Sequence, residues 1–194
     1  MAKSKKLAVI ILAAGKSSRL GSITKQLLKI DGETFLETSI KKALSVSKDV
    51  FVVLGHKRET CEKEIKHFNV TILFNKNYEK GIGSSISFGI KHTIEYENTL
   101  ILLCDQPFIT QEHIKQLKDN IDNKTIIASK YEHISESSVP AIFPKNYYNE
   151  LIKLNKDKGA KKILKNNPCT NVVLSKKQSI DIDTINDVDI YLDL

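Results

Sequence analysis

The chain of 194 residues is 41% hydrophobic and 27% charged, which is typical of a globular protein with a substantial core and predicts a single domain over residues 1–194. Its three cysteines lack the spacing of a zinc or redox site, and no apolar run approaches the roughly 18 residues of a membrane span, so we expect a cytoplasmic protein without a membrane partner. The net charge of +7 comes from lysines spread among acidic residues, which argues against a nucleic-acid partner and fits small anionic substrates.

The first predicted element is an apolar strand that ends in a glycine loop. Residues 7–13 are wholly apolar, a pattern typical of a strand buried on both faces of a parallel sheet. The loop that follows lies where open α/β sheets bind ligands. Gly15 allows close backbone approach to a phosphate, and Lys16 and Arg19 add positive charge, so the loop is predicted to bind a nucleoside triphosphate. It is not a Walker A loop, because Ile10 occupies the position of that motif's first glycine.

Strands and helices alternate along the rest of the chain. Further strands are predicted at residues 49–54, 70–74, 99–104 and 125–128, with shorter ones at 140–143 and 171–174. Helices are predicted at residues 34–45, 59–68, 84–96, 111–121 and 145–154, and after residue 184. This alternation predicts an α/β fold, a Rossmann-like three-layer sandwich with a mostly parallel central sheet. Residues 131–145 are polar and irregular, and we interpret them as an inserted loop or hairpin on the substrate side.

A second glycine-containing segment opens the helix predicted from Ser84. Gly81, Ser84 and Ser85 are typical of a helix N-terminus that binds an anion or a base edge, although ordinary helix capping explains the same residues. A dinucleotide-binding fingerprint is excluded, because Ile86 occupies its third glycine position. Residues 157–160 open another helix in a similar way, with the same alternative.

Two acidic segments supply candidate metal ligands. Asp105 directly follows the apolar strand at residues 99–104, at the same crevice as the first loop, and its oxygens suit Mg²⁺ beside a triphosphate. A simple turn opened by Asp105 is the alternative. In an extended segment only one of Asp181 and Asp183 faces a given side, so one of them is expected to join Asp105 on the metal. The other stays outside or caps the final helix, and a plain N-cap with acidic flanks explains both.

These segments, taken in order, resemble those of the molybdenum cofactor cytidylyltransferases, within the MobA-like nucleotidyltransferases. Residues 12–21 match the family's LAAGxSxRxG loop, and residues 25–28 match the KxLL segment that follows it. Five further matches extend the resemblance over nearly the whole chain: residues 81–85 to G-x-x-x-S, 103–107 to LGDQP, 139–143 to the substrate stretch, 157–160 to GDxGA and 181–184 to DIDT. A single motif of this kind is weak, whereas seven in the family's order are specific.

The resemblance implies transfer of a cytidylyl group from CTP to the terminal phosphate of molybdopterin, with release of pyrophosphate and Mg²⁺ as the cofactor. It implies catalytic roles for Arg19, Lys25 and Asp105, and metal binding by Asp105 and Asp183. Ala14 stands where the guanylyltransferases of this group usually have glycine, which favours cytosine over guanine. The implied nucleotide-binding residues are Leu12, Ala13, Ala14, Gly15, Lys16, Ser17, Ser18, Arg19, Lys25, Gly81, Ser84 and Ser85.

Three alternatives stay open. The chain could use GTP as a molybdenum cofactor guanylyltransferase, or transfer a nucleotide to a sugar or alcohol phosphate on the same fold. A protein of another class, a non-catalytic carrier for molybdenum hydroxylases, would bind the cofactor without releasing pyrophosphate. The molybdenum cofactor hypotheses imply a molybdenum hydroxylase apoenzyme as the protein partner.

Overall fold

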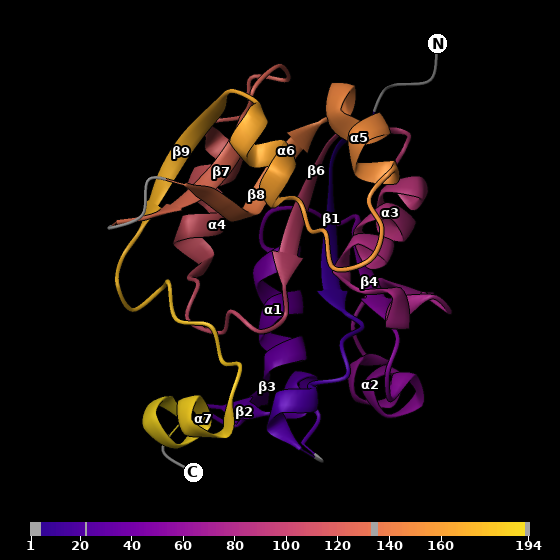
Figure 1. The fold of residues 1–194 in the computed structure, drawn as a ribbon, viewed down its shortest axis with the longest axis vertical. Helices are drawn as coiled ribbons and strands as arrows, with labels where there is room; N and C mark the ends of the chain where they lie inside the picture. Colours follow the sequence, from indigo (N-terminus) through magenta and orange to yellow (C-terminus); the bar gives the residue numbers. More distant parts are fainter. Residues whose placement is uncertain (1–4, 22, 133–135, 193–194) are drawn as a thin grey trace.

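The computed structural model describes residues 5–21, 23–132 and 136–192, which build an α/β architecture around a central sheet (Figure 1). Within these residues seven strands lie in the order β5-β4-β1-β6-β8-β7-β9. The predicted fold class, a three-layer sandwich with a mostly parallel sheet, is confirmed. The strands are β1 (Lys5–Ala13), β4 (Val50–Leu54), β5 (Thr71–Phe74), β6 (Tyr96–Leu103), β7 (Ile126–Tyr131), β8 (Ser137–Pro144) and β9 (Cys169–Leu174).

Strand β1 is buried on both faces because its alternate side chains belong to two different cores. Val9 and Ile11 lie in one core, and Ile10 and Leu12 lie in the other. Its parallel neighbours β4 and β6 pair with its backbone on both edges. The apolar run seen in the sequence therefore forms a central strand, as its composition predicts.

Helices cover both faces of the sheet. On one face α1 contacts β1 and β4 and packs against α2 and α4; on the other, α3 contacts β1 and β4 and packs against α5, while α6 contacts β8. None of the described helices combines the length and apolar character needed to cross a membrane. The helices are α1 (Phe35–Leu44), α2 (Arg58–Ile65), α3 (Ile82–His92), α4 (Gln111–Asp119), α5 (Tyr148–Ile152), α6 (Lys161–Asn166) and α7 (Ile185–Tyr191), with short 3-10 turns η1 (Ser18–Leu20), η2 (Lys25–Leu27), η3 (Tyr78–Lys80) and η4 (Lys145–Tyr147).

Several predicted helix boundaries are wrong. The helix predicted at residues 84–96 starts earlier, at Ile82, and ends at His92, because Tyr96 already pairs with β1 as the first residue of β6. The helix expected to open at residues 157–160 begins only at Lys161, after a turn in which Lys156 has a left-handed φ of 55°. The helix predicted at 59–68 ends at Ile65, and the one at 145–154 is divided between η4 and α5.

Within residues 131–145, the described residues include the end of β7 and all of β8, which pair as a hairpin, one of the two predicted alternatives. Strand β8 returns antiparallel to β7 and inserts between β7 and β6, which makes the sheet mixed. Residues 133–135 of this segment lie outside the described part of the chain. A second hairpin, β2 (Lys29–Ile30) with β3 (Glu33–Thr34), was not predicted, although the Asp31-Gly32 pair at its tip has positive φ angles of 52° and 84° and is a strong hairpin signal.

Candidate active site

The glycine loop after β1 is held in place by a buried glutamine. Gln26 is 4% exposed, and its Nε2 donates hydrogen bonds of 2.9 Å to the carbonyl oxygens of Ala13 and Gly15. Ser17 has a left-handed φ of 55°, and its hydroxyl oxygen accepts a 3.0 Å hydrogen bond from the backbone N–H of Lys25. A β carbon added at Gly15 would meet no atom within 4 Å. The loop is therefore fixed from behind and open at Gly15.

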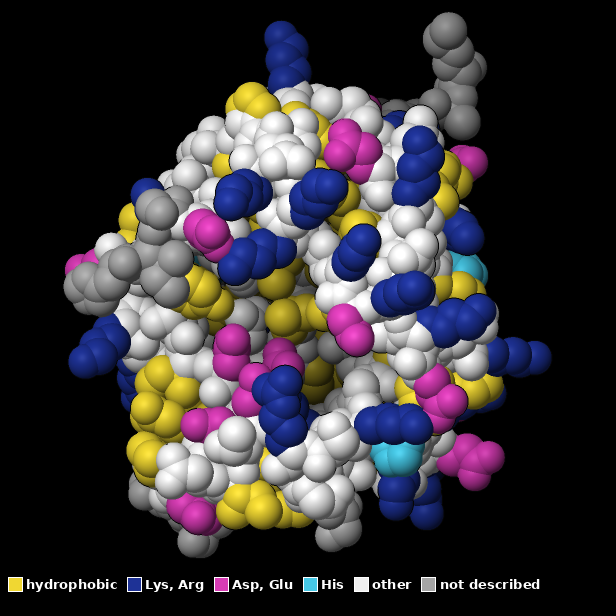
Figure 2. Space-filling view, in the orientation of Figure 1, with side chains coloured by type: hydrophobic (Ala, Val, Ile, Leu, Met, Phe, Trp, Pro, Cys, Tyr) yellow, Lys and Arg dark blue, Asp and Glu magenta, His cyan; other side chains and the backbone are white. Residues whose placement is uncertain are grey.

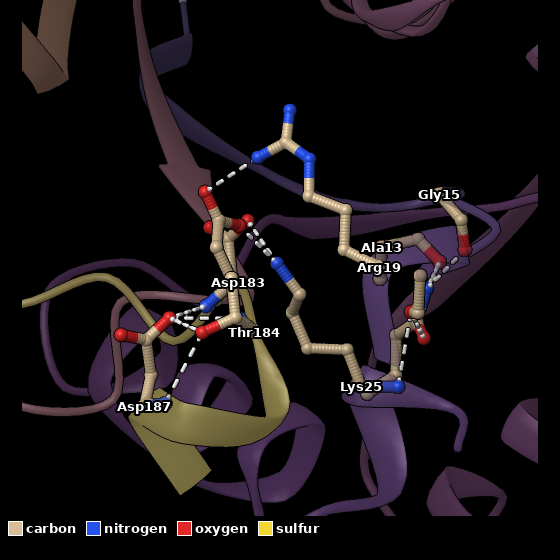
Figure 3. Close-up of polar contacts among 10 residues, drawn as sticks. Ala13, Gly15, Arg19, Lys25, Asp183, Thr184 and Asp187 are labelled. Carbon is tan, nitrogen blue, oxygen red and sulfur yellow. Dashed lines mark hydrogen bonds and ion pairs between the residues drawn. The ribbon is translucent and has the colours of Figure 1, made fainter. Parts of the chain in front are cut away.

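Four charged side chains converge beside this loop, and Figure 3 labels three of them, Arg19, Lys25 and Asp183. The Lys25 ammonium lies 2.5 Å from Asp183 Oδ1 and 3.2 Å from Asp105 Oδ2, although these residues are 158 and 80 positions away in the sequence. Arg19 Nη1 lies 3.3 Å from Asp183 Oδ2. We refer to Arg19, Lys25, Asp105 and Asp183 as the charged cluster. It is built where η2, the end of β6 and the start of α7 meet, so only the fold brings its members together.

The capping of α7 fixes the position of Asp183. The side chain of Thr184 accepts a hydrogen bond from the backbone N–H of Asp187, and Asp187 Oδ2 accepts from the backbone N–H groups of Asp183 and Thr184 at 3.0 and 2.7 Å. These bonds form a capping box, with Asp in place of the usual Glu. The backbone that carries Asp183 toward Lys25 is therefore fixed by the Asp187 carboxylate, which binds two adjacent N–H groups.

The electrostatics of the cluster keep Lys25 charged. Burial opposes the charged form of Lys25, but Asp105 and Asp183 outweigh this effect and hold its pKa above the ordinary value. Loss of hydration, with the nearby charges of Asp105 and Asp183, raises the pKa of Asp181 to about 6. Of the two acids left open by the sequence, Asp183 is the one that ion-pairs with Lys25.

Asp105 has an oxygen that the protein leaves unused. Its Oδ1 is buried and has no hydrogen-bond partner among the described residues. An unpaired buried carboxylate oxygen is costly, and oxygen is the donor atom that Mg²⁺ prefers. No group of three or more His, Cys, Asp or Glu side chains in the described ranges is arranged to hold a metal. The carboxylate pair Asp105 and Asp183 therefore suits a cation that takes its other ligands from water or phosphate.

A cavity of about 430 Å³ lies between the glycine loop and the N-terminus of α3. The face drawn in Figure 2 is hollowed near its centre, with hydrophobic side chains on the floor and acidic and basic side chains at the lower rim. The charged cluster reaches this cavity through Asp105, which forms part of its wall. The lining residues are Leu12, Ala14, Gly15, Lys16, Ser18, Tyr78, Glu79, Gly81, Ile82, Ser85, Leu103, Asp105 and Asp157.

A smaller recess of about 230 Å³ adjoins the first cavity and shares Leu12, Ile82 and Leu103 with it. Its remaining wall comes from α3, α6 and the β7–β8 hairpin. The apolar wall includes Ile86, Ile101, Val139 and Leu164, and the polar part includes Tyr131, Glu136, Ser137, Ser138 and Lys161. The hairpin that interrupts the parallel order of the sheet therefore lies beside the recess, on the side where the sequence placed a substrate segment.

The segment at residues 81–85 contacts the one at residues 157–160, two motifs that the sequence could not place together. Gly81 has a φ of 96°, and a β carbon added there would meet the Asp157 side chain and lie 2.6 Å from the backbone oxygen of Lys156, so this close approach requires glycine. Ser85 lines the cavity, and its hydroxyl oxygen accepts a 3.0 Å hydrogen bond from Asn75. The Ser84 hydroxyl donates to the Gly81 carbonyl oxygen at 2.9 Å, whereas the N-cap residue Gly81 makes no side-chain capping hydrogen bond, so ordinary side-chain capping does not account for this segment. Asn75, which is 2% exposed and ties both serines together, received no role from the sequence.

Other expected phosphate contacts lie at the cavity mouth. Lys16 is paired with Glu79 of η3 at 2.6 Å, and this partner raises the pKa of Lys16.

From the sequence, no role was assigned to two glutamines beside the site, Gln26 and Gln106. Gln26 lies inside a matched motif and is a polar residue in a short apolar segment, which is a signal that could have marked it. Gln106 is 5% exposed, and its Oε1 lacks a partner among the described residues, which only the structure reveals.

Comparisons with known sequences find relatives that match most of the chain. The family model described as MobA-like NTP transferase domain matches residues 9–172. A protein of Clostridium perfringens (strain SM101 / Type A) named "Probable molybdenum cofactor guanylyltransferase" is 29% identical over 198 aligned residues, covering 97% of this chain and 96% of that protein. The "Bifunctional protein GlmU" of Aliarcobacter butzleri (strain RM4018) is 39% identical over 132 residues, covering 66% of this chain and 29% of that protein. This chain therefore spans under a third of the length of that relative.

Solved structures share the fold. The crystal structure of Rv0371c from Mycobacterium tuberculosis H37Rv superposes with a TM-score of 0.86 at 22% identity, covering 99% of this chain and 100% of that chain. The complex of Rv0371c with manganese gives a TM-score of 0.83 at 19% identity, with the same coverage of both chains. At these identities the likeness concerns the arrangement of the chain in space.

Proposed function

This chain belongs to the family of MobA-like NTP transferase domains, and we propose that it transfers the cytidylyl group of CTP to the terminal phosphate of molybdopterin. An oxygen of the acceptor phosphate attacks the α-phosphorus of CTP. The new bond joins that oxygen to the α-phosphorus, the bond to the β-phosphate breaks, and pyrophosphate leaves. The observation that carries the proposal is the charged cluster beside the 430 Å³ cavity, since two cations and two carboxylates meet where the glycine loop ends.

Transfer of this kind needs positioning and charge neutralisation more than covalent help from the protein. Arg19 and Lys16 bind the triphosphate in the proposal, and Lys25 stabilises the negative charge that builds up around the α-phosphorus. The side chains of Arg19 and Lys16 are 73% and 52% exposed, which leaves them free to turn toward a ligand. The backbone from Leu12 to Ser18, with Gly81, Ser84 and Ser85, frames the nucleotide.

Asp105 and Asp183 hold the divalent cation that the proposal requires, Mg²⁺. The unpartnered, buried Oδ1 of Asp105 is the feature of this chain that fits such an ion. When bound, the ion supplies positive charge next to the phosphate oxygens. The manganese complex of Rv0371c supports a divalent cation for this fold.

Ala14 supports CTP as the nucleotide. Its side chain is 6% exposed and lines the cavity, so its methyl group takes up space that a glycine would leave to a larger base. The name of the Clostridium perfringens relative favours GTP instead, and a molybdenum cofactor guanylyltransferase is therefore the second candidate. The acceptor occupies the adjoining recess between α6 and the β7–β8 hairpin, and a molybdenum hydroxylase apoenzyme receives the product.

The proposal is tested by pyrophosphate release from CTP and from GTP, each with Mg²⁺ and with or without molybdopterin carrying molybdenum. We expect release with CTP only when the acceptor is present. The Asp105→Asn variant should lower this rate by about a hundredfold or more. Asp189→Asn, an exposed acid on α7, is the matched control and should retain full activity.

Each contrary outcome would contradict a different part of the proposal. Release with GTP alone would overturn the interpretation of Ala14, and release with sugar phosphates would overturn the acceptor. Nucleotide binding without any pyrophosphate release would favour the carrier of another class.

A further inference from the structure

Lys25 lies in the space between the two carboxylates that the proposed function assigns to the cation. Its ammonium group is within 3.2 Å of Asp105 and 2.5 Å of Asp183, and its side chain is only 14% exposed. A lysine ammonium and a bound metal ion both seek carboxylate oxygens, so they compete for the same two side chains.

The cluster leaves few oxygens for an additional cation. Asp183 Oδ1 is paired with Lys25 and Asp183 Oδ2 with Arg19, while Asp105 Oδ2 is paired with Lys25. Asp105 Oδ1 is the carboxylate oxygen of the cluster that has no hydrogen-bond partner among the described residues. Two acids and two bases also balance in charge. A divalent cation that enters this cluster alone finds one unpartnered carboxylate oxygen, with Lys25 and Arg19 already paired to the other three.

A nucleotide changes this balance because its phosphates attract the same basic side chains. Lys25 is anchored through its backbone N–H to the Ser17 hydroxyl at 3.0 Å, but its four-carbon stem can turn. Arg19 is mostly exposed and is held to Asp183 by a single 3.3 Å contact. Both bases can therefore transfer from the carboxylates to phosphate oxygens without movement of the backbone, which frees up to three oxygens of Asp105 and Asp183.

We propose that Lys25 occupies the cation position of the nucleotide-free protein, so that the divalent cation binds only together with the nucleotide that draws Lys25 away. This inference rests on the proposed function for the identity of the nucleotide and the cation. It predicts a property of the protein alone: removal of the Lys25 charge creates a metal site that the unmodified protein does not offer.

The experiment measures Mn²⁺ binding to the protein without nucleotide, by titration calorimetry and by the electron paramagnetic resonance signal of free Mn²⁺. Lys25→Met keeps the length of the side chain and removes its charge. We expect it to bind one Mn²⁺ about tenfold or more tightly than the unmodified protein. Lys29→Met changes an exposed lysine of β2 and is the matched control, which should leave the affinity unchanged. Lys25→Gln provides the same comparison if Lys25→Met does not fold.

The double variant Lys25→Met/Asp105→Asn should return to weak binding, because the new site requires the Asp105 carboxylate. Equal Mn²⁺ affinity in Lys25→Met and the unmodified protein would overturn the inference, as would tight binding that survives Asp105→Asn. The proposed function fails separately, on pyrophosphate release. If no nucleotide is turned over while Lys25→Met gains Mn²⁺ affinity, the function is wrong and the inference about Lys25 stands.

Discussion

Arg19 and Lys25 contact the same aspartate but differ in what holds them. The side chain of Arg19 is 73% exposed, so its ion pair with Asp183 lies in water, where such pairs contribute little to stability. Lys25 is mostly buried and bonded to two carboxylates. We therefore expect Arg19 to serve in binding a ligand, whereas Lys25 also links η2 to the end of β6 and the start of α7.

Replacement of Arg19 by alanine tests this distinction. We expect Arg19→Ala to lower kcat/KM for the nucleotide about a hundredfold, equivalent to about 3 kcal/mol of transition-state stabilisation. Its free energy of unfolding should change by less than about 0.5 kcal/mol, measured by urea denaturation. Arg58→Ala is the control, since Arg58 pairs with Glu62 on α2 and should leave the rate unaffected. Near-normal turnover by Arg19→Ala would remove this residue from the proposed site.

Helix α4 is held to strands β7 and β8 by a buried chain of hydrogen bonds. His113 of α4 lies 2.8 Å from the Ser129 hydroxyl of β7, and this hydroxyl donates a 2.7 Å hydrogen bond to the Pro140 carbonyl oxygen of β8. Ser129 thus accepts from His113, which assigns the imidazole proton to Nε2 of a neutral ring. Burial lowers the pKa of His113 to about 4. Burial at this contact between α4 and the hairpin therefore favours the uncharged histidine.

This arrangement predicts that the fold weakens in mild acid. The unfolded chain binds a proton at His113 near pH 6.5, while the folded protein does so only near pH 4. The stabilising contribution of neutral His113 is therefore fully present above pH 6.5 and is lost as the pH falls toward 4. We expect a loss on the order of 2 kcal/mol in the free energy of unfolding, measured by urea denaturation at pH 7, 5.5 and 4.5.

The matched comparison is with His113→Gln, which cannot titrate. Asp181 has a raised pKa of about 6 and acts in the opposite sense, since the folded protein binds its proton more readily. The difference between the two proteins isolates the effect of His113, because Asp181 is present in both. Parallel pH profiles for the unmodified protein and His113→Gln would contradict the prediction.

At the scale of elements, local rules were sufficient where the deciding residues are neighbours in the sequence. The capping box of Thr184 and Asp187 involves residues three positions apart, and α7 begins where this motif indicates. The helix start expected at residues 157–160 was misjudged, and this segment packs against Gly81, a contact between distant parts of the sequence that a local pattern does not reveal. The Lys25–Asp183 contact has the same cause, and the sequence suggested both residues through a resemblance without showing that they touch.

For the whole molecule, the hydrophobic pattern of the sequence predicts the fold class but not the order of the strands in the sheet. The apolar strands and their helices predict a layered α/β fold, because each element must bury one or two faces. The place of β8 between β6 and β7 is set by pairing between distant segments, for example Leu100 with Ile142. Apolar alternation in a short strand is the same for parallel and antiparallel neighbours. The hairpin alternative was predictable, and its insertion into the sheet was not.

The thermal stability of the whole protein gives a test of nucleotide choice that does not depend on the acceptor. A ligand that binds only the folded protein raises its stability by about 2.7 kcal/mol at a hundred times its Kd. For a chain of 194 residues this corresponds to a rise in Tm of about 5–10 °C. We expect this shift in calorimetry with CTP and Mg²⁺ together, a smaller one with GTP at equal concentration, and almost none with Mg²⁺ alone, because Lys25 then keeps its place between the carboxylates. Asp105→Asn should reduce the CTP shift while its Tm without ligand stays close to that of the unmodified protein. A larger shift with GTP would assign the cavity beside Ala14 to guanine, and a full shift with Mg²⁺ alone would contradict the competition between Lys25 and the cation.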